Sequence, residues 1–148
     1  MLFRSVSQSR YAGQLLTSTE KINGIENGTY NYVYKNGKLY AKKGVSQGKN
    51  EESVFEYNAV GRLSKITNTK SGEVNAVTEF SNDKTVGTYT QTTTFFYKGK
   101  PTRLNVKNYE DGNLLAEGER FGDKDIITFR KMEYNDKGLL VKSIATLS

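Results

Sequence analysis

The chain of 148 residues contains no cysteine, no histidine and no tryptophan. The lack of cysteine excludes disulfides and thiolate chemistry, and it leaves the redox compartment open. Without histidine or cysteine, Ser-His-Asp and Cys-His catalytic groups cannot form, and neither can the usual zinc sites. The sequence also lacks a P-loop and a dinucleotide-binding fingerprint. We therefore expect no cofactor, no metal site and a non-enzymatic role.

Long apolar segments are missing too. No run approaches the roughly 18 apolar residues of a membrane helix, so we expect no transmembrane segment. Residues 1–16 lack the continuous apolar core of a signal peptide, so either export does not use such a peptide or a leader has been removed. Apolar residues make up 35% of the chain, against about 45–50% in an average domain. This low content predicts a thin β structure rather than a thick core.

The formal charge of +6 raises the question of a nucleic-acid partner. The lysines are scattered over expected turns and strands instead of forming a cluster. A basic patch is the usual footprint of nucleic-acid binding. We therefore expect a solvated surface, and nucleic acid is an unlikely partner.

The residue types that are abundant in the chain favour β-strands. The chain has 10 tyrosines and 7 phenylalanines, with many threonine, valine and isoleucine residues, all of which suit a pleated sheet. The single proline, Pro101, falls in an expected turn. We expect one domain over residues 1–148. Residues 1–14 are expected to form an irregular or helical extension, with an edge strand as the alternative for residues 1–12.

One motif recurs: an aromatic residue, a short polar stretch, a glycine and then leucine. Its copies begin at Tyr34, Tyr57, Tyr109 and Tyr134. The residues that define the three later copies are Tyr57, Gly61, Leu63, Tyr109, Gly112, Leu114, Tyr134, Gly138 and Leu140. Asn36-Gly37 and Asp111-Gly112 are strong signals for two-residue hairpin turns. Each copy therefore predicts one hairpin.

The spacing of aromatic residues supports a repeat. Tyr11, Tyr34, Tyr57 and Phe80 stand 23 residues apart, after which the period loosens. A period in the twenties fits two strands and two turns per unit. The expected strands cover 15–21, 29–35, 38–44, 53–58, 62–69, 73–81, 85–97, 102–109, 113–121, 125–135 and 139–146. Such short connections predict an all-β antiparallel meander of hairpins. This meander is either an open, twisted single-layer sheet or an up-and-down barrel.

The unit from Tyr57 to Leu63 resembles the YD repeat of RHS and wall-associated proteins, with Asn58 in place of the aspartate. The units that begin at Tyr34 and Tyr109 are similar to bacterial variants of the MORN repeat. Both families build one hairpin per repeat, so the resemblance favours the open sheet. It also implies a secreted or cell-surface bacterial location, and it supplies neither a function nor a catalytic residue.

Tyr30, Tyr32 and Tyr34 alternate along one expected strand and so share a face. Tyr40 and Lys42 follow on the next strand. Aromatic rings beside positive charge can hold a sugar or a single-stranded nucleic acid. These five residues are the predicted binding set, although core packing of the tyrosines is the more common use of such a pattern.

Glu117 and Glu119 also share a face of an expected strand, about 6–7 Å apart. Paired carboxylates can serve glycoside hydrolysis, whereas cross-strand pairing with lysine is the structural alternative.

The leading hypothesis is a non-enzymatic protein-interaction or structural module that uses a sheet face or edge. It would bind a protein partner or associate with itself, as a component of a larger assembly or a bacterial surface protein. One alternative is a lipocalin-like barrel for a small apolar ligand. Another is a carboxylate-dependent protein that acts on or binds glycans.

Overall fold

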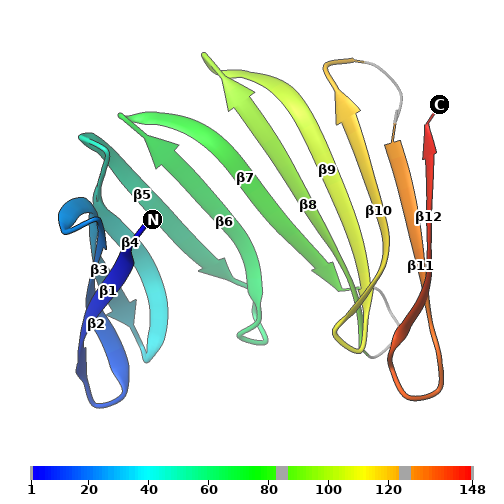
Figure 1. The fold of residues 1–148 in the computed structure, drawn as a ribbon, viewed down its shortest axis with the longest axis horizontal. Coiled ribbons are helices and arrows are strands. Elements are labelled where there is room, and N and C mark those ends of the chain that lie inside the picture. Colours follow the sequence, from blue (N-terminus) through cyan, green and yellow to red (C-terminus); the bar gives the residue numbers. More distant parts are fainter. Residues whose placement is uncertain (1, 83–86, 124–127, 148) are drawn as a thin grey trace.

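The computed structural model of the chain describes residues 2–82, 87–123 and 128–147. These residues form one sheet of twelve antiparallel strands, in which each strand pairs with the next along the chain (Figure 1). The strands are β1 (Arg4–Tyr11), β2 (Gln14–Ile22), β3 (Ile25–Lys35), β4 (Lys38–Ser46), β5 (Lys49–Tyr57), β6 (Leu63–Lys70), β7 (Glu73–Asn82), β8 (Thr88–Tyr97), β9 (Lys100–Glu110), β10 (Asn113–Phe121), β11 (Thr128–Tyr134) and β12 (Leu140–Leu147).

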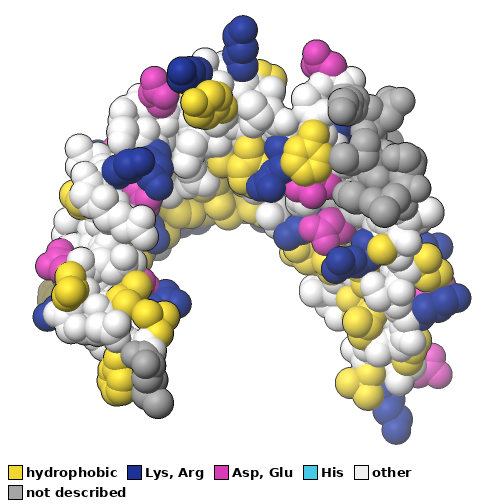
Figure 2. Space-filling model, turned by 45° about the horizontal axis from the view of Figure 1, so that its top comes forward, with side chains coloured by type: hydrophobic (Ala, Val, Ile, Leu, Met, Phe, Trp, Pro, Cys, Tyr) yellow, Lys and Arg dark blue, Asp and Glu magenta, His cyan; other side chains and the backbone are white. Residues whose placement is uncertain are grey.

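The sheet is open. The strand order runs from β1 to β12 without a pairing between these two, so both are edge strands. Figure 2 shows the sheet bent into an arch with a hollow beneath it. The predicted open, twisted antiparallel meander is confirmed, and the barrel alternative is not formed. Within the described residues there is no helix long and apolar enough to cross a membrane.

Two-residue turns explain why adjacent strands pair so regularly. Seven turns place a non-glycine residue at φ of 48–51° before a glycine at φ of 74–81°. Two successive positive φ values define the type I′ turn, whose twist matches that of paired strands. The seven pairs are Ala12-Gly13, Asn23-Gly24, Asn36-Gly37, Gln47-Gly48, Ser71-Gly72, Lys98-Gly99 and Asp111-Gly112. Glycine is needed at the second position because it takes the larger positive φ without steric cost.

The strands are longer than the sequence predicted at several points. Residues 4–11 form the edge strand β1 rather than a helical extension. β3 begins at Ile25 instead of residue 29, because the turn at 23–24 needs only two residues. The expected strand starts at residues 85 and 125 lie outside the described residues.

The two faces of the sheet differ in burial. On β3, Tyr30, Tyr32 and Tyr34 are half-buried, whereas the residues between them are exposed. Side chains crowd on the inside of a bent sheet, so the face that carries these tyrosines is called the inner face. Hydrophobic side chains also gather on the inside of the arch in Figure 2.

A single-layer sheet leaves little room for a core. Among the described residues other than glycine, only Ala41, Ala76, Thr78 and Met132 are buried, and no large side chain is fully buried. The chain exposes 10563 Å², whereas a compact globular protein of 16.6 kDa would expose about 7600 Å². The fold therefore depends on contacts between neighbouring strands.

One row of side chains links the hairpins along the inner face. Its tyrosine–leucine pairs lie beside the turns that join β3 to β4, β5 to β6, β9 to β10 and β11 to β12, at the lower end of the sheet in Figure 1. Cross-strand partners in this tyrosine–leucine row are Tyr34 and Leu39, Tyr57 and Leu63, Tyr109 and Leu114, and Tyr134 and Leu140. Tyr89 on β8 continues the row, with its ring stacked on Tyr109 at 4.7 Å between centroids. Such cross-strand pairs are the basic stabilising unit of a sheet.

Candidate functional site

A group of interacting polar and aromatic side chains on the inner face spans β3 to β6. The hydroxyl of Tyr30 donates a hydrogen bond of 2.9 Å to the Glu51 carboxylate. Lys70 Nζ lies 3.5 Å from the same carboxylate. Lys42 Nζ lies 4.1 Å from the centroid of the Tyr30 ring and 5.9 Å from that of Tyr32. This group is called the Tyr30 cluster.

Two glycines allow the Tyr30 ring to lie across the sheet. A Cβ atom on Gly44 would overlap the carbonyl oxygen of Thr29 and would stand 2.7 Å from Tyr30 Cδ1. A Cβ atom on Gly28 would stand 3.2 Å from Tyr30 Cε2. The ring therefore fills the space above these glycines, as aromatic residues do over glycine in sheets. Lys42 also contacts the ring. The main role of the Tyr30 ring is therefore to pack against its neighbours in the sheet.

The surroundings of Tyr30 raise the pKa of its phenol. Burial is the main cause, because it disfavours the charged phenolate. The hydrogen bond to Glu51 and the negative charges of Glu51 and Glu20 raise it further, whereas a hydrogen bond with Ser46 acts in the opposite direction. A raised pKa favours folding below the ordinary value of about 10, and this contribution is lost as the pH rises through the folded-state value.

The Glu51→Gln substitution is expected to lower the pKa of Tyr30 towards the ordinary value. It removes the charge that repels the phenolate, while burial continues to act. Alkaline titration of the tyrosine ring by NMR measures this shift. Glu52→Gln is the matched control, because Glu52 pairs with Lys43 at 3.6 Å and is not among the groups that act on Tyr30. An equal shift in both variants would contradict the assigned role of Glu51.

The structure places the five predicted binding residues in three different surroundings. Tyr30, Tyr32 and Lys42 lie together in the Tyr30 cluster, and Tyr34 belongs to the tyrosine–leucine row. Tyr40 occupies a β-bulge and contacts Lys35, whose Nζ lies 3.5 Å from its ring centroid.

Lys35 alternates with Tyr34, so Tyr40 lies on the outer face, opposite the other tyrosines. The sequence did not indicate that Glu51 and Gly44 would lie against Tyr30. The pattern of residues along a strand does not reveal which residues meet across strands.

The repeat residues have a clear structural role. The Tyr57 hydroxyl donates a hydrogen bond of 2.8 Å to the Leu39 carbonyl oxygen, and the Tyr134 hydroxyl donates one of 2.7 Å to that of Leu114. Each of these tyrosines thus ties its hairpin to the preceding one. Lys38 Nζ adds a hydrogen bond of 2.7 Å to the Gly61 carbonyl oxygen.

The two longer turns of the repeat share one design. The Asn58 side-chain oxygen accepts hydrogen bonds from the backbone N–H groups of Val60 and Arg62. Asn135 accepts the equivalent bonds from Lys137 and Leu139. Asparagine and aspartate stabilise turns in this way, and the closing glycines, Gly61 and Gly138, have φ of 81° and 74°.

The carboxylate pair on β10 is engaged in cross-strand contacts. Glu117 Oε1 lies 3.9 Å from Lys107 Nζ and accepts a hydrogen bond of 3.1 Å from the Asn105 amide. Glu119 Oε1 lies 3.3 Å from Arg103 Nε. These contacts support the structural alternative for the pair. Over the described ranges, no group of three or more acidic side chains is placed to hold a metal ion.

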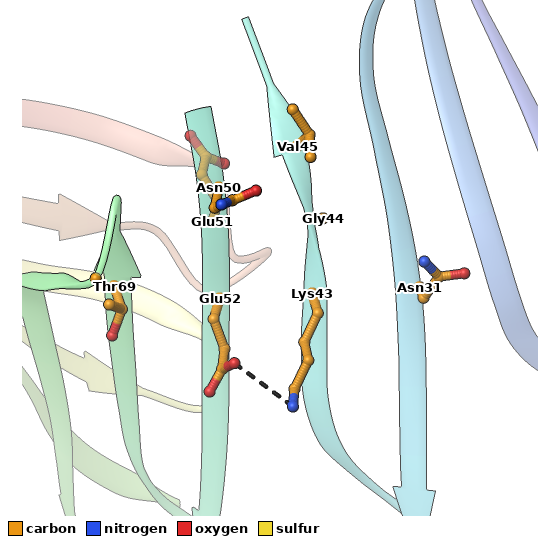
Figure 3. A pocket seen from close by; sticks show the side chains of 9 residues that line it. Asn31, Lys43, Gly44, Val45, Asn50, Glu51, Glu52 and Thr69 are labelled. Carbon is orange, nitrogen blue, oxygen red and sulfur yellow. Dashed lines mark ion pairs between the residues drawn. The ribbon is translucent and has the colours of Figure 1, made fainter. Parts of the chain in front are cut away.

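A hollow of about 520 Å³ lies along β4 and β5 (Figure 3). Its lining includes Asn31, Asn50 and Thr69, with an ion pair of 3.6 Å between Lys43 and Glu52. The Glu51 carboxylate also lines the hollow and has its own cation, Lys70, at 3.5 Å, so the hollow presents no concentrated charge to a ligand. It is open and polar, and so it differs from the apolar pockets that hold small molecules.

Comparisons with known proteins leave the family open. No family model matches the sequence, and no curated protein is similar to it. One structurally similar chain is a protein with unknown function from Bacteroides fragilis NCTC 9343. It shares 11% sequence identity with a TM-score of 0.31, over 99% of this chain and 93% of that one. So low a similarity assigns neither a family nor a function.

Proposed function

We propose that this chain is a non-enzymatic protein-binding or structural module, with an inner face that a protein partner covers. The observation that carries the proposal is the exposed surface of 10563 Å², well above the roughly 7600 Å² of a compact protein of this mass. Exposed apolar side chains on both faces contribute to the excess, and within the described residues no second layer covers the half-buried tyrosines of the inner face. Large exposed apolar areas commonly mark protein contacts.

The charges of the inner face favour a protein partner over nucleic acid. Four of its cations are already paired with carboxylates: Arg4 with Glu20, Lys70 with Glu51, Arg103 with Glu119, and Lys107 with Glu117. Nucleic-acid affinity depends on cations that are free to neutralise phosphates. Paired, mixed charge beside an apolar row is more typical of a protein interface.

The alternatives have less support. A lipocalin-like ligand site requires a closed barrel, and this sheet is open. A carboxylate mechanism requires a carboxylate available to a substrate, whereas Glu117 and Glu119 are ion-paired. Glycan binding at the tyrosines stays a secondary proposal. The likeness to YD and MORN-type repeats also stays a proposal, and it agrees with an interaction role.

Photo-crosslinking tests the proposal. A benzoylphenylalanine residue replaces Tyr32 on the inner face or, as the matched control, Tyr40 on the outer face. Both sites are tyrosines on neighbouring strands, so the probe changes each locally in the same way. In the cells that produce the protein, we expect position 32 to give one protein adduct of defined mass and position 40 to give none.

Three outcomes would overturn the proposal. One is the absence of adducts at position 32, and another is equal labelling at both positions. The third is a glycan, rather than a protein, as the species bound to the inner face.

A further inference from the structure

The two edges of the sheet differ sharply in chemistry. β1 has the sequence RSVSQSRY, with two arginines and a single exposed aliphatic side chain, Val6. β12 has the sequence LVKSIATL, in which Lys142 is the only charged residue. Leu140, Val141 and Ile144 on β12 are 56%, 60% and 42% exposed. β12 is therefore the more apolar and less charged edge.

Edge strands present unpaired backbone N–H and C=O groups, and proteins usually protect them with charge, proline or bulges. β1 carries arginine near both of its ends. β12 carries no proline, and its one bulge, at Val141, lies next to its first residue. The remaining segment, 142–147, pairs regularly with β11 and so offers a straight outer edge.

We infer that β12 pairs with β12 of a second copy of this chain, in antiparallel orientation about a two-fold axis at Ile144. This register places Ile144 opposite its symmetry mate and Lys142 opposite Thr146, so the two lysines do not face each other. It also joins two sheets into one, with the backbone groups of both edges paired. The inference goes beyond the proposed function, because it concerns the edge and not the inner face.

Charge favours this pairing over the other two edge combinations. A junction of two β1 strands would bring together four arginines, and of these, within the described part of the chain, only Arg4 on each strand has a carboxylate partner, Glu20 on β2. A junction of β1 with β12 would combine two arginines and a lysine, without an acidic residue on either strand. The β12 pair contains only two cations, which its register separates. A two-fold dimer is also the commonest closed assembly, whereas repeated junctions of β1 with β12 would form open chains.

The length of β12 limits the expected affinity of the dimer. Eight residues of strand span about 27 Å, and a single strand pair buries less than the roughly 1,200 Å² of a standard interface. The dimer is therefore weak and depends on concentration. Light scattering is expected to show the mean mass rising from 16.6 kDa towards twice that value as the concentration increases.

Single cysteines provide a direct test, because the natural chain has none. Residues opposite each other in antiparallel strands have Cα atoms about 4.5–5.5 Å apart, within the range that a disulfide can join. Under mild oxidation, Ile144→Cys is expected to form a covalent dimer. Val6→Cys is the matched control, since Val6 is an exposed aliphatic residue near the middle of the other edge.

Charge variants test the same contact without oxidation. Ile144→Lys would place two lysines face to face at the axis, so this variant is expected to remain at 16.6 kDa where the natural chain dimerises. Val6→Lys is expected to dimerise normally, and circular dichroism confirms that both variants keep their sheet. A natural chain that stays monomeric at the highest attainable concentration would overturn the inference. Equal cross-linking of both cysteine variants, or masses that grow beyond the dimer, would also overturn it.

Discussion

Replacing Gly44 with alanine is expected to lower the free energy of unfolding by about 3 kcal/mol. The added Cβ atom would overlap the carbonyl oxygen of Thr29 on the neighbouring strand and would press on the ring of Tyr30. The obstacle is backbone, which cannot rotate away as a flexible side chain can. β3 and β4 would have to separate locally, with loss of the ladder bonds between them. Urea unfolding followed by circular dichroism measures the change.

Gly28→Ala is the matched control. Gly28 lies beneath the same ring, but its added Cβ atom would stand 3.2 Å from Tyr30 Cε2 and 3.3 Å from the Val45 carbonyl oxygen. Shifts of a few tenths of an ångström relieve such contacts, so we expect a cost of about 1 kcal/mol. If the two alanine variants were equally stable, Gly44 would not be required for the close approach of β3 and β4.

Replacing Tyr57 with alanine is expected to lower the free energy of unfolding by about 2–3 kcal/mol. The truncation removes a half-buried ring from the tyrosine–leucine row, together with the hydrogen bond to the Leu39 carbonyl oxygen. Tyr57→Phe keeps the ring and loses only the hydroxyl, so its expected cost is about 1 kcal/mol. The difference between the two variants separates packing from hydrogen bonding.

The control for the row is Tyr97→Ala. Tyr97 is 67% exposed and lies beside a turn at the opposite end of the sheet from the row. Its removal is expected to change stability by no more than about 0.5 kcal/mol. Equal losses for Tyr57→Ala and Tyr97→Ala in urea unfolding would show that the row does not hold neighbouring hairpins together.

The Gly44→Ala and Tyr57→Ala substitutions test two different contacts that stabilise the single-layer sheet. Gly44 controls how closely strands approach in the middle of the sheet, whereas Tyr57 links one hairpin to the next at its end. In a protein with a thick core, many contacts would share each of these roles. Here no large side chain of the described residues is fully buried. Each of these two contacts therefore contributes a larger part of the free energy of unfolding.

The candidate site was only partly predictable from the sequence. Alternation along β3 correctly put Tyr30, Tyr32 and Tyr34 on one face, because successive side chains of a strand point to opposite sides. It could not reveal the bulge that turns Tyr40 to the outer face, since bulges arise from the pairing of two strands. Nor could it show that Glu51 would meet Tyr30 from a strand two positions away.

The sequence by itself determined that the chain is an antiparallel meander of hairpins. Glycine-containing turns, alternating aromatic residues and a repeat of 23 residues are local signals, and short connections force neighbouring strands to pair. It also marked Asn36-Gly37 and Asp111-Gly112 as tight turns, since both residue types tolerate positive φ.

Only the tertiary structure decided the rest. Pairing with neighbouring strands holds Ala12, Gln47, Ser71 and Lys98 at positive φ, a conformation that these residues do not favour alone. Pairing likewise makes residues 4–11 a strand, because β2 supplies the hydrogen-bond partners. Whether the meander closes also depends on twist and bend summed over all twelve strands. That sum keeps β1 and β12 from pairing with each other. It therefore leaves open the two edges and the inner face through which we expect the protein to act.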